Sequence, residues 1–454
     1  MLDALLLSRI QFGFTVGFHI LFPTLTIGLA WFLVFVEARW HRTGRPVWIK
    51  LYLFWVKIFA LTFGMGVVSG LVLSYEFGTN FARFSEIAGP VMGPLLSVEV
   101  LTAFFVEAGF LGVMLFGWNK VGPRLHFLAT LLVAIGTTNS AFWILSANSW
   151  MHTPAGVEWI DGRIVPVDWW AVVFNPSFPY RLAHMLLASL VTSSLVITAV
   201  SAHALLRRRD LAFARHGLRL GATVLVLSAV AQVVAGDLHG LNVREHQPVK
   251  VAAMEGLWET RRGAPLVLFG WPDAEAETNR WAVEVPKLAS LILTHDPDGE
   301  VIGLDSVPPA ERPPVALVFW AFRVMVGLGL LFVLLGVVAA WQAWRGSAER
   351  HPMLLKGLIL AGPLGFVATI AGWIVAESGR QPWVVHGMLR TRDAGSAIDP
   401  AAVLSSLLLF VVVYGVLFTG YLSFVLRLIR SGLQPVTLRY PKAMRGARAA
   451  EIVE

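Results

Sequence analysis

The segment LLKGLILAGPLGFVATIAGWIVAESGRQPW, residues 354–383, holds an apolar run long enough to cross a bilayer and ends that run with a carboxylate. Glu377 follows Trp373 by four positions, so the two side chains share a helix face. A carboxylate at the end of a membrane span needs a partner, a metal or a proton to carry. The alternative is an interfacial acid that extends toward water beside Arg380. The rest of the sequence has to decide between them.

The composition predicts a membrane protein with several spans. Apolar residues make up 56% of the 454 positions and charged residues only 14%, whereas a soluble chain carries nearer a quarter charged residues. The complete absence of cysteine excludes disulfides, thiolate haem ligands, iron–sulfur clusters and cysteine zinc sites. The start, MLDALLLSRIQF, lacks a basic region before its apolar core, so we expect no cleaved signal peptide.

Nine apolar runs reach the length of about 20 residues that a bilayer requires. They are residues 14–36, 52–76, 95–118, 125–147, 182–206, 218–237, 315–341, 354–376 and 402–426. The odd-numbered connections and the tail are rich in arginine and lysine, while the even-numbered connections mix acids and bases. Because cytoplasmic loops carry the excess of basic residues, we expect the N-terminus outside and the C-terminus in the cytoplasm.

Four regions follow from this topology. They are residues 1–236 with spans one to six and an outer loop at 148–181, a hydrophilic outer loop at 237–314, spans seven to nine at 315–426, and a basic cytoplasmic tail at 427–454. A connection as long as the second region is usually functional or disordered.

The long loop has recognisable parts. Residues 249–260 predict an amphipathic helix with Val251, Met254 and Trp258 on one side. The ordinary interpretation of Lys250 and Glu255 is the solvated face of that helix. Residues 307–314, VPPAERPP, predict a stiff return linker.

Side chains able to bind a metal gather at one depth. The predicted topology places His19, His184, Met325 and Glu377 in the outer half of the membrane, on four different helices. Without cysteine, histidine, methionine and carboxylate are the side chains available to haem iron. Each residue taken alone is more often a packing residue, and the shared depth also fits the ion site of a transporter.

The third span carries two acids, Glu99 and Glu107. In a regular helix, eight positions separate them by about 12 Å along the axis and rotate them by about 80°. Membrane acids of this kind often belong to proton relays. Lys57 could open such a path from the cytoplasm, although a lysine that reaches for the interface is the more common case. Ser140 could be a relay hydroxyl or a helix-packing serine.

Several long motifs together carry a family resemblance. They are SRIQFGFTVGFHILFPTLTIGLA (8–30), GPLLSVEVLTAFFVEAGFLGVMLFGW (93–118), TTNSAFWILSANSWM (137–151), RLAHM (181–185), KVAAMEGLWET (250–260), FWAFRVMVG (319–327) and AGWIVAESGRQPW (371–383). With them the chain resembles subunit I of the cytochrome bd-type quinol oxidases over nearly its whole length. Its short outer loop is similar to that of the short-loop, cyanide-insensitive branch.

The resemblance implies three haems. His184 and Met325 match the two axial ligands of a low-spin haem b, whereas His19 and Glu377 match the ligands of two high-spin haems, one of which binds oxygen. The third haem is haem d or another haem b. Further matches contact the haems: Arg9, Arg323 and Arg380 as residues near the cofactors or their propionates, Trp373 as an aromatic residue between haems, and Glu99 beside the high-spin pair.

The resemblance also implies the substrate, the proton route and the partners. Lys250 and Glu255 match residues that handle quinol, ubiquinol or menaquinol, at the outer face. Glu107 matches a member of an inward proton path, to which Lys57 and Ser140 could belong. Oxygen reduction with cytoplasmic protons would then generate a proton motive force without pumping. The family implies a second multi-span subunit, with a small single-span subunit as a further candidate, in the bacterial cytoplasmic membrane.

The implied fold is an all-α integral membrane protein with nine transmembrane helices, mainly two four-helix bundles plus one peripheral helix. The histidines show neither the spaced pairs of the cytochrome b of quinol–cytochrome c reductases nor the histidine cluster of haem–copper oxidases. A multi-span transporter with an outer-half ion site is the remaining alternative. The inverted repeats and broken helices typical of transporters are not evident.

Overall fold

The computed structural model describes residues 3–118 and 120–433, and within them nine helical segments are long and apolar enough to cross a membrane. The spans are α1 (Ala4–Thr43), α2 (Pro46–Thr79), α3 (Ala82–Glu99) with η1 (Val100–Phe104) and α4 (Phe105–Phe116), α5 (Pro123–His152), α6 (Trp169–Val173) with α7 (Phe178–Leu206), α8 (Leu211–His246), α11 (Val315–Trp344), α12 (Pro352–Ala361) with α13 (Leu364–Ser378), and α14 (Pro400–Ser431). All nine predicted runs are therefore confirmed as helical spans.

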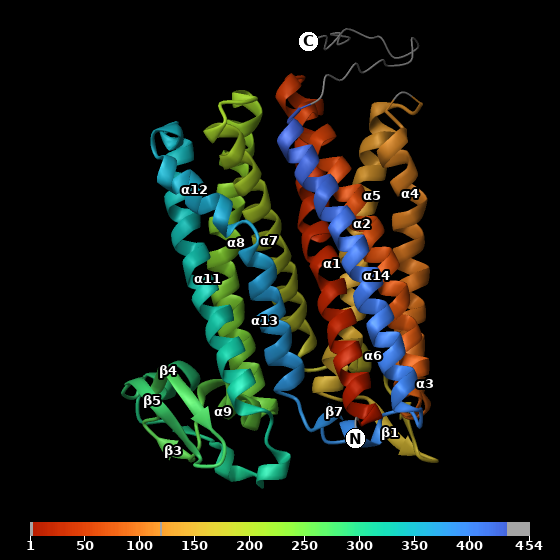
Figure 1. The fold of residues 1–454 in the computed structure, drawn as a ribbon, viewed down its shortest axis with the longest axis vertical. Helices are drawn as coiled ribbons and strands as arrows, with labels where there is room; N and C mark the ends of the chain where they lie inside the picture. The colour runs from red at the N-terminus through yellow and green to blue at the C-terminus, as the bar shows by residue number, and fades with distance from the viewer. Residues whose placement is uncertain (1–2, 119, 434–454) are drawn as a thin grey trace.

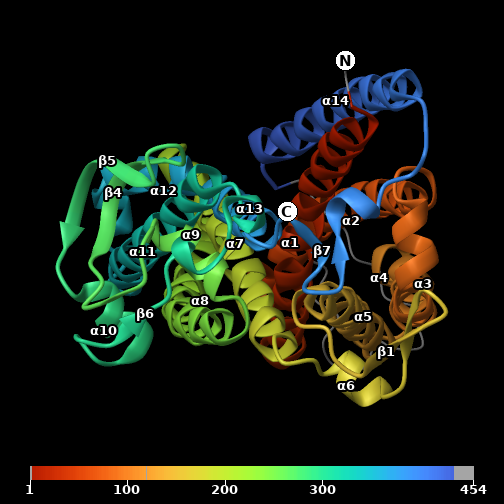
Figure 2. The same cartoon turned by 90° about the horizontal axis from the view of Figure 1, so that it is seen from below.

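The helices form two groups, which Figure 2 shows along the helix axes. One group contains α7, α8, α11 and the α12–α13 pair. The other contains α1, α2, α5 and the third span, and α1 packs against α7 where the groups meet. The last helix, α14, lies at the edge of the second group against α1 and α2. This arrangement matches the expected two bundles and one peripheral helix.

A ladder of aromatic rings joins the last helix to the first. Tyr414 of α14 stacks on Phe18 of α1 with ring centroids 4.3 Å apart, and Phe14 lies on the other side of Tyr414 at 5.8 Å. Further along both helices, Tyr421 of α14 contacts Phe22 of α1 edge-on, with ring centroids 5.6 Å apart. Offset-stacked and edge-to-face pairs of this kind stabilise beyond the area that they bury. The chain thus closes on itself through α1.

The outer connections all lie at the end of the bundle where the N-terminus lies, and the described chain ends at the opposite end (Figure 1). The outer loop at 148–181 contains the antiparallel pair β1 (Val157–Ile160) and β2 (Arg163–Pro166). The last contains β7 (Trp383–Val385), β8 (Leu389–Arg390) and the turn η5 (Thr391–Asp393). The number of spans places the two ends of the described chain on opposite sides.

The long loop is more ordered than the sequence suggested. Its elements are α9 (Pro248–Glu255), β3 (Arg261–Arg262), β4 (Leu266–Asp273), β5 (Thr278–Val285), α10 (Leu288–Thr294), β6 (Glu300–Val301), η2 (Leu304–Ser306) and η3 (Pro309–Glu311). The sixth span continues as α8 to His246, beyond its predicted end at residue 237. The predicted helix over 249–260 is shorter, because Gly256 ends α9 in the left-handed conformation at φ 66°.

Ion pairs hold the return linker at 307–314. Arg390 of β8 pairs with Glu311, and Arg312 donates to Glu277 at 2.7 Å. Proline stiffness is therefore only part of what fixes this segment. The basic tail residues Arg439, Lys442, Arg445 and Arg448 lie outside the described residues, so the sidedness of the chain stays a prediction.

Candidate active site

His19 of α1 is held by a serine of the neighbouring helix. Its Nδ1 lies 2.9 Å from Ser69 Oγ, and the Ser69 hydroxyl lies 2.8 Å from the carbonyl oxygen of Met65. Because the single hydroxyl proton goes to that carbonyl, the imidazole Nδ1–H donates to Ser69 and leaves Nε2 with a free lone pair. A Cβ on Gly70 would stand 3.2 Å from His19 Cε1, so glycine lets the imidazole ring lie close against α2.

Glycines also face the next two predicted ligands. A Cβ on Gly236 of α8 would stand 3.4 Å from His184 Cε1, and one on Gly372 of α13 would stand 2.9 Å from Met325 Sδ. His184 Nδ1 is buried without a hydrogen-bond partner among the described residues. Within the same residues, His, Asp and Glu form no group of three that could hold a metal ion. A haem iron requires only one or two protein ligands, so these isolated side chains fit that cofactor.

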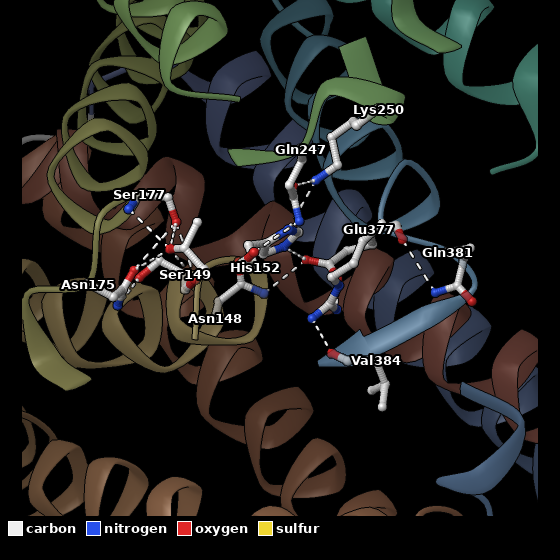
Figure 3. A network of polar contacts seen from close by, with 12 residues as sticks. Asn148, Ser149, His152, Asn175, Ser177, Gln247, Lys250, Glu377, Gln381 and Val384 are labelled. Atoms are coloured by element: carbon white, nitrogen blue, oxygen red, sulfur yellow. Dashed lines mark hydrogen bonds and ion pairs between the residues drawn. The ribbon is translucent and has the colours of Figure 1, made fainter. Parts of the chain in front are cut away.

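Glu377 lies at the end of α13, where it contacts α5 (Figure 3). Asn148 Nδ2 donates to Glu377 Oε1 at 2.9 Å, and His152 Nε2 lies 3.3 Å from the same oxygen. Arg380 donates to Oε2 from the following turn. The ion pair with an arginine that is expected of an interfacial acid is therefore present. The same carboxylate also accepts hydrogen bonds from two polar side chains of α5.

A directed chain of hydrogen bonds connects Glu377 with the long loop (Figure 3). Lys250 Nζ of α9 lies 3.1 Å from His152 Nδ1 and also donates to Gln247 Oε1. Since an ionised carboxylate can only accept, the His152 proton lies on Nε2 and points to Glu377. His152 Nδ1 is then an acceptor, and Lys250 donates to it. Lys250, fully buried His152 and Glu377 thus form one polar unit across three elements.

The interpretation of Lys250 and Glu255 as a solvated face is wrong, because their exposed fractions are only 3% and 7%. Burial holds the pKa of Lys250 well below its usual range, and the positive charges of Arg181 and Arg380 act in the same direction. Burial also raises the pKa of Glu255, while Arg323, whose Nη2 lies 3.0 Å from Glu255 Oε2, opposes that rise.

Arg323 of α11 binds backbone carbonyls of the long loop at 237–314. Its Nη1 donates to the Met254 carbonyl at 2.7 Å, and its Nε donates to the Val267 carbonyl at 2.9 Å. Met325 lies two positions further along α11 and therefore projects from a different face, toward Gly372. Arg323 thus contacts Glu255 of the long loop, whereas Met325 lies against α13.

Two other arginines retain buried donor groups. The Nε atoms of Arg181 and Arg380 are buried and have no hydrogen-bond partner among the described residues. Buried guanidinium donors fit a carboxylate such as a haem propionate. Sequence reasoning did not single out Arg181, although it lies three positions before His184 in RLAHM. Arg9 is exposed and donates to Gln381 Oε1 at 3.4 Å.

Trp373 is half-buried on α13, four positions before Glu377. His386, in the turn between β7 and β8, lies near the same cluster, and burial lowers its pKa to about 4. The positive charges of Lys250 and Arg380 add to this effect. The cluster therefore combines strong positive charge with neutral imidazoles.

The two acids of the third span lie against the same helix. Ser140 of α5 donates to Glu99 Oε1 at 2.6 Å, and a Cβ on Gly136 would stand 2.6 Å from Glu107 Cγ. Gly136 and Ser140 are one turn apart, so both acids face one side of α5. The prediction of a regular helix is wrong here, because η1 is a π-helical turn, which holds more residues per turn and so changes the relative rotation of the two acids.

Lys57 lies on an exposed side of α2. Within the described part of the chain, neither a hydrogen bond nor an ion pair connects it with Glu99, Glu107 or Ser140. Its part in the proton path stays a prediction.

Two buried acids were missed. Glu37 and His126 lie 2.7 Å apart with exposed fractions of 0% and 1%. Glu76 accepts a hydrogen bond from Thr15 at 2.7 Å and lies in the α1–α2 interface. Acids are rare in apolar spans, and this rarity was the sequence signal for Glu37 and Glu76. Their partners His126 and Thr15 lie on other spans and share no motif with them.

The comparisons with known proteins agree with this architecture. The family model described as cytochrome bd terminal oxidase subunit I matches residues 7–433. The chain is 32% identical over 514 aligned residues to the cytochrome bd-II ubiquinol oxidase subunit 1 of Escherichia coli (strain K12), covering 98% of this chain and 100% of that protein. It is 33% identical to the putative cytochrome bd menaquinol oxidase subunit I of Bacillus subtilis (strain 168), with 92% and 94% coverage.

The solved bd oxidase of Geobacillus thermodenitrificans has the same fold, with a TM-score of 0.88 at 32% identity over 95% of this chain and 99% of that chain. These findings disfavour the transporter alternative. The chain belongs to the cytochrome bd terminal oxidase subunit I family and is a subunit of a respiratory terminal oxidase of the bacterial cytoplasmic membrane.

Proposed function

We propose that this chain oxidises quinol at its outer face and carries the haems that deliver the electrons to oxygen. The observation that carries the proposal is the repeated geometry of the ligand candidates. His19, His184 and Met325 each face a glycine of a neighbouring helix, at positions where a Cβ would stand 2.9–3.4 Å from the ligand side chain. Glycine at these positions lets each ligand candidate lie close against the backbone of a neighbouring helix.

The ligand assignments follow from the chemistry of the side chains. His184 and Met325 would hold a low-spin haem b, while His19 and Glu377 would each hold one high-spin haem. Bound haem iron transfers single electrons, and an iron with an open axial position binds oxygen. His19 is prepared for this role because Ser69 fixes its Nδ1–H and leaves Nε2 free.

The arginines proposed for the haem propionates differ from those that the family resemblance implies. The donors of Arg323 are already used by Glu255 and two loop carbonyls. Arg181 and Arg380 retain buried Nε groups, so we assign the propionates to them and give Arg323 to the quinol site. Trp373, four positions before Glu377, would lie between the haems.

At the outer face, Glu255 and Lys250 would bind the quinol head group. Each quinol loses two electrons and two protons when it becomes quinone. The raised pKa of Glu255 makes this carboxylate a stronger base for one of those protons. One relative is named a ubiquinol oxidase and another a menaquinol oxidase, so we propose quinol only as a class.

On the other side, Glu107 and then Glu99 with Ser140 would carry cytoplasmic protons inward, with Lys57 as a candidate entry residue. Four electrons and four protons convert one oxygen molecule to two waters. Taking protons from one side and releasing them on the other generates a proton motive force without pumping. The packing of both acids against α5 supports one continuous route.

We further propose a second multi-span subunit, with a small single-span subunit as an additional candidate. The relatives are named as subunit 1 or subunit I, and α4 exposes Phe105 and Phe116 at 59% and 69%. The short-loop assignment is supported by length, since the alignment with the Escherichia coli relative spans 514 positions against 454 residues here.

The test is a reduced-minus-oxidised visible spectrum of the purified complex, with haem extraction and a quinol-dependent oxygen-uptake assay. Three haems per copy with a chlorin-type band, together with quinol oxidation, would establish a haem d enzyme. Three haems without that band would establish an all-b enzyme. A complex without haem would overturn the ligand roles of His19, His184, Met325 and Glu377.

A further inference from the structure

The hairpin of β4 and β5 exposes an unusual amount of apolar surface for a loop that faces water. Its exposed large apolar side chains are Leu268, Phe269, Trp271, Trp281 and Val283, with exposed fractions of 52%, 49%, 53%, 77% and 55%. Exposed apolar patches of this kind usually mark a surface that contacts a partner or a membrane.

One face of the hairpin continues into the membrane-spanning part of the chain. Phe269 and Trp271 contact Trp320 of α11, with ring centroids 5.2 Å and 6.3 Å apart. Trp320 lies within the first two turns of α11, and Leu317 and Val324 lie on the same side of that helix with exposed fractions of 49% and 41%. Exposed apolar side chains of a spanning helix contact lipid or a neighbouring subunit, so the aromatic face continues an apolar stripe of the membrane-embedded surface.

The position of the hairpin agrees with this. Along the helix axes, β4 and β5 lie at the rim of the molecule, outside α11 (Figure 2). In the side view they lie beside the outer end of α11 (Figure 1). The space next to such a rim at the membrane surface is lipid head group, where tryptophan is enriched because its ring is apolar and its N–H is polar.

The hairpin is held at a fixed height. Arg323 of α11 donates to the Val267 carbonyl of β4 through Nε at 2.9 Å and through Nη2 at 2.6 Å. Val267 itself is buried. Because a two-stranded hairpin alone is marginally stable, this attachment decides where its free face lies.

We propose that Phe269, Trp271 and Val283 lie in the head-group region of the outer leaflet, as a lipid-contacting face of the long loop. This inference rests on the membrane location of the family and does not require the proposed quinol chemistry. Arg323 donates hydrogen bonds to β4 and to Glu255. This side chain would therefore connect the lipid-contacting face with that carboxylate.

The absence of cysteine in the chain gives a direct test by spin labelling. Single variants W271C and V283C are labelled in the complete complex, reconstituted in lipid nanodiscs, and their collision rates with oxygen and with a water-soluble nickel complex are measured. E284C is the matched control, since it is exposed and neighbours Val283 on the same strand with its side chain on the other face. L330C on α11 reports lipid contact, and the parent complex treated with the same spin label gives the background of other subunits.

We expect the ratio of oxygen to nickel collisions at residues 271 and 283 to exceed that of E284C several-fold and to lie below that of L330C, which is in the middle of α11. Ratios equal to that of E284C would place the hairpin in water and overturn the proposal. Labels shielded from both reagents would show that another protein covers this face, which overturns it equally. Quinol oxidation by each labelled variant confirms that the complex is assembled.

Discussion

Two regions of the molecule bury carboxylates: the polar cluster at the outer end of the bundle and the third span. The partners of the carboxylates differ between these two regions. In the outer cluster, Glu377 contacts Arg380 and His152, and Glu255 contacts Arg323. In the third span, Glu99 has the hydroxyl of Ser140 and Glu107 packs on Gly136, and neither has an ion-pair partner among the described residues. Similar side chains therefore have cationic partners in one region and neutral partners in the other.

The difference teaches what each region is built to do. A buried carboxylate paired with a cation is held in one orientation, which suits a ligand or a substrate-binding group. A membrane acid without a cation is typical of a proton relay. Sorting the buried acids by their partners therefore divides the residues proposed to bind haem or quinol from those proposed to carry protons inward, and the following variants test that division.

The largest effect is expected from R323Q, which leaves Glu255 buried without its cation. Removing one partner of a buried ion pair typically costs about 3–5 kcal/mol. We expect the long loop to open, measured as faster proteolysis between residues 256 and 314 in the intact complex.

The control is K287Q in the same loop, since Lys287 pairs with Asp298 and both side chains are exposed, at 55% and 66%. An exposed pair contributes at most about 1 kcal/mol, so this loop should stay nearly as resistant as in the parent. The double variant R323M/E255M should recover part of the resistance lost in R323Q. Equal cleavage of R323Q and K287Q would show that the Arg323–Glu255 pair does not hold the loop.

The next effect is expected from E107Q, which keeps the shape of the side chain but removes the proton. Loss of a proton-transfer group typically slows a reaction by about 10²-fold or more. Oxygen uptake should fall accordingly, while the haem spectrum stays unchanged. E86Q is the control, because Glu86 is exposed on α3 and pairs with Arg83 at 2.7 Å. Unchanged turnover and proton uptake in E107Q would remove this acid from the route.

A smaller effect is expected from the pH dependence of K250M. Because burial holds the pKa of Lys250 below that of the unfolded chain, the unfolded state binds more protons below the usual lysine pKa. The penalty on folding is therefore present at pH 7 and disappears as the pH rises toward about 10.4. The melting temperature of K250M minus that of the parent should fall steadily from pH 7 to 9.5.

The slope of that difference cannot exceed about 1.4 kcal/mol per pH unit for one proton. K287M is the control for loss of a lysine from the same loop, because Lys287 is 55% exposed beside Asp298. A flat difference for K250M would mean that burial does not lower the pKa of Lys250 in the folded complex.

The smallest effect is expected from S140A, which removes the hydroxyl that donates to Glu99. A single hydrogen bond contributes about 1 kcal/mol, equivalent to a turnover about fivefold lower. S146A on the same helix is the control, since Ser146 donates to the carbonyl of Val173 at 3.0 Å and not to an acid. A loss in S140A as large as in E107Q would make Ser140 an essential carrier.

The sequence was sufficient for the spans because apolar length alone determines which segments cross a membrane. It also predicts His19, His184, Met325 and Glu377 as haem-ligand candidates, since few residue types can bind haem iron in a chain without cysteine, and these ligand roles stay predictions. The environments of these side chains were not predictable. The glycines that face them lie on other helices, and no rule of spacing connects Gly236 to His184.

The errors have physical causes as well. Lys250 and Glu255 were assigned to a solvated face because helical periodicity cannot show that a loop covers both sides of α9. The relative rotation of Glu99 and Glu107 depended on η1, and a π-helical turn has no sequence signal in VLTAF. Pairs such as Glu37 with His126 require the order in which helices pack, which charge and hydropathy do not encode.

The aromatic ladder between α1 and α14 has a consequence for how the chain is made. Phe18 of α1 emerges from the ribosome early, yet its stacking partner Tyr414 is nearly 400 residues later in the sequence. At about 5–20 residues per second, translation needs roughly 20–80 s to supply that partner. During this interval the face of α1 with Phe14, Phe18 and Phe22 must rest against lipid or an insertion factor. The final helix is therefore the step that completes the bundle.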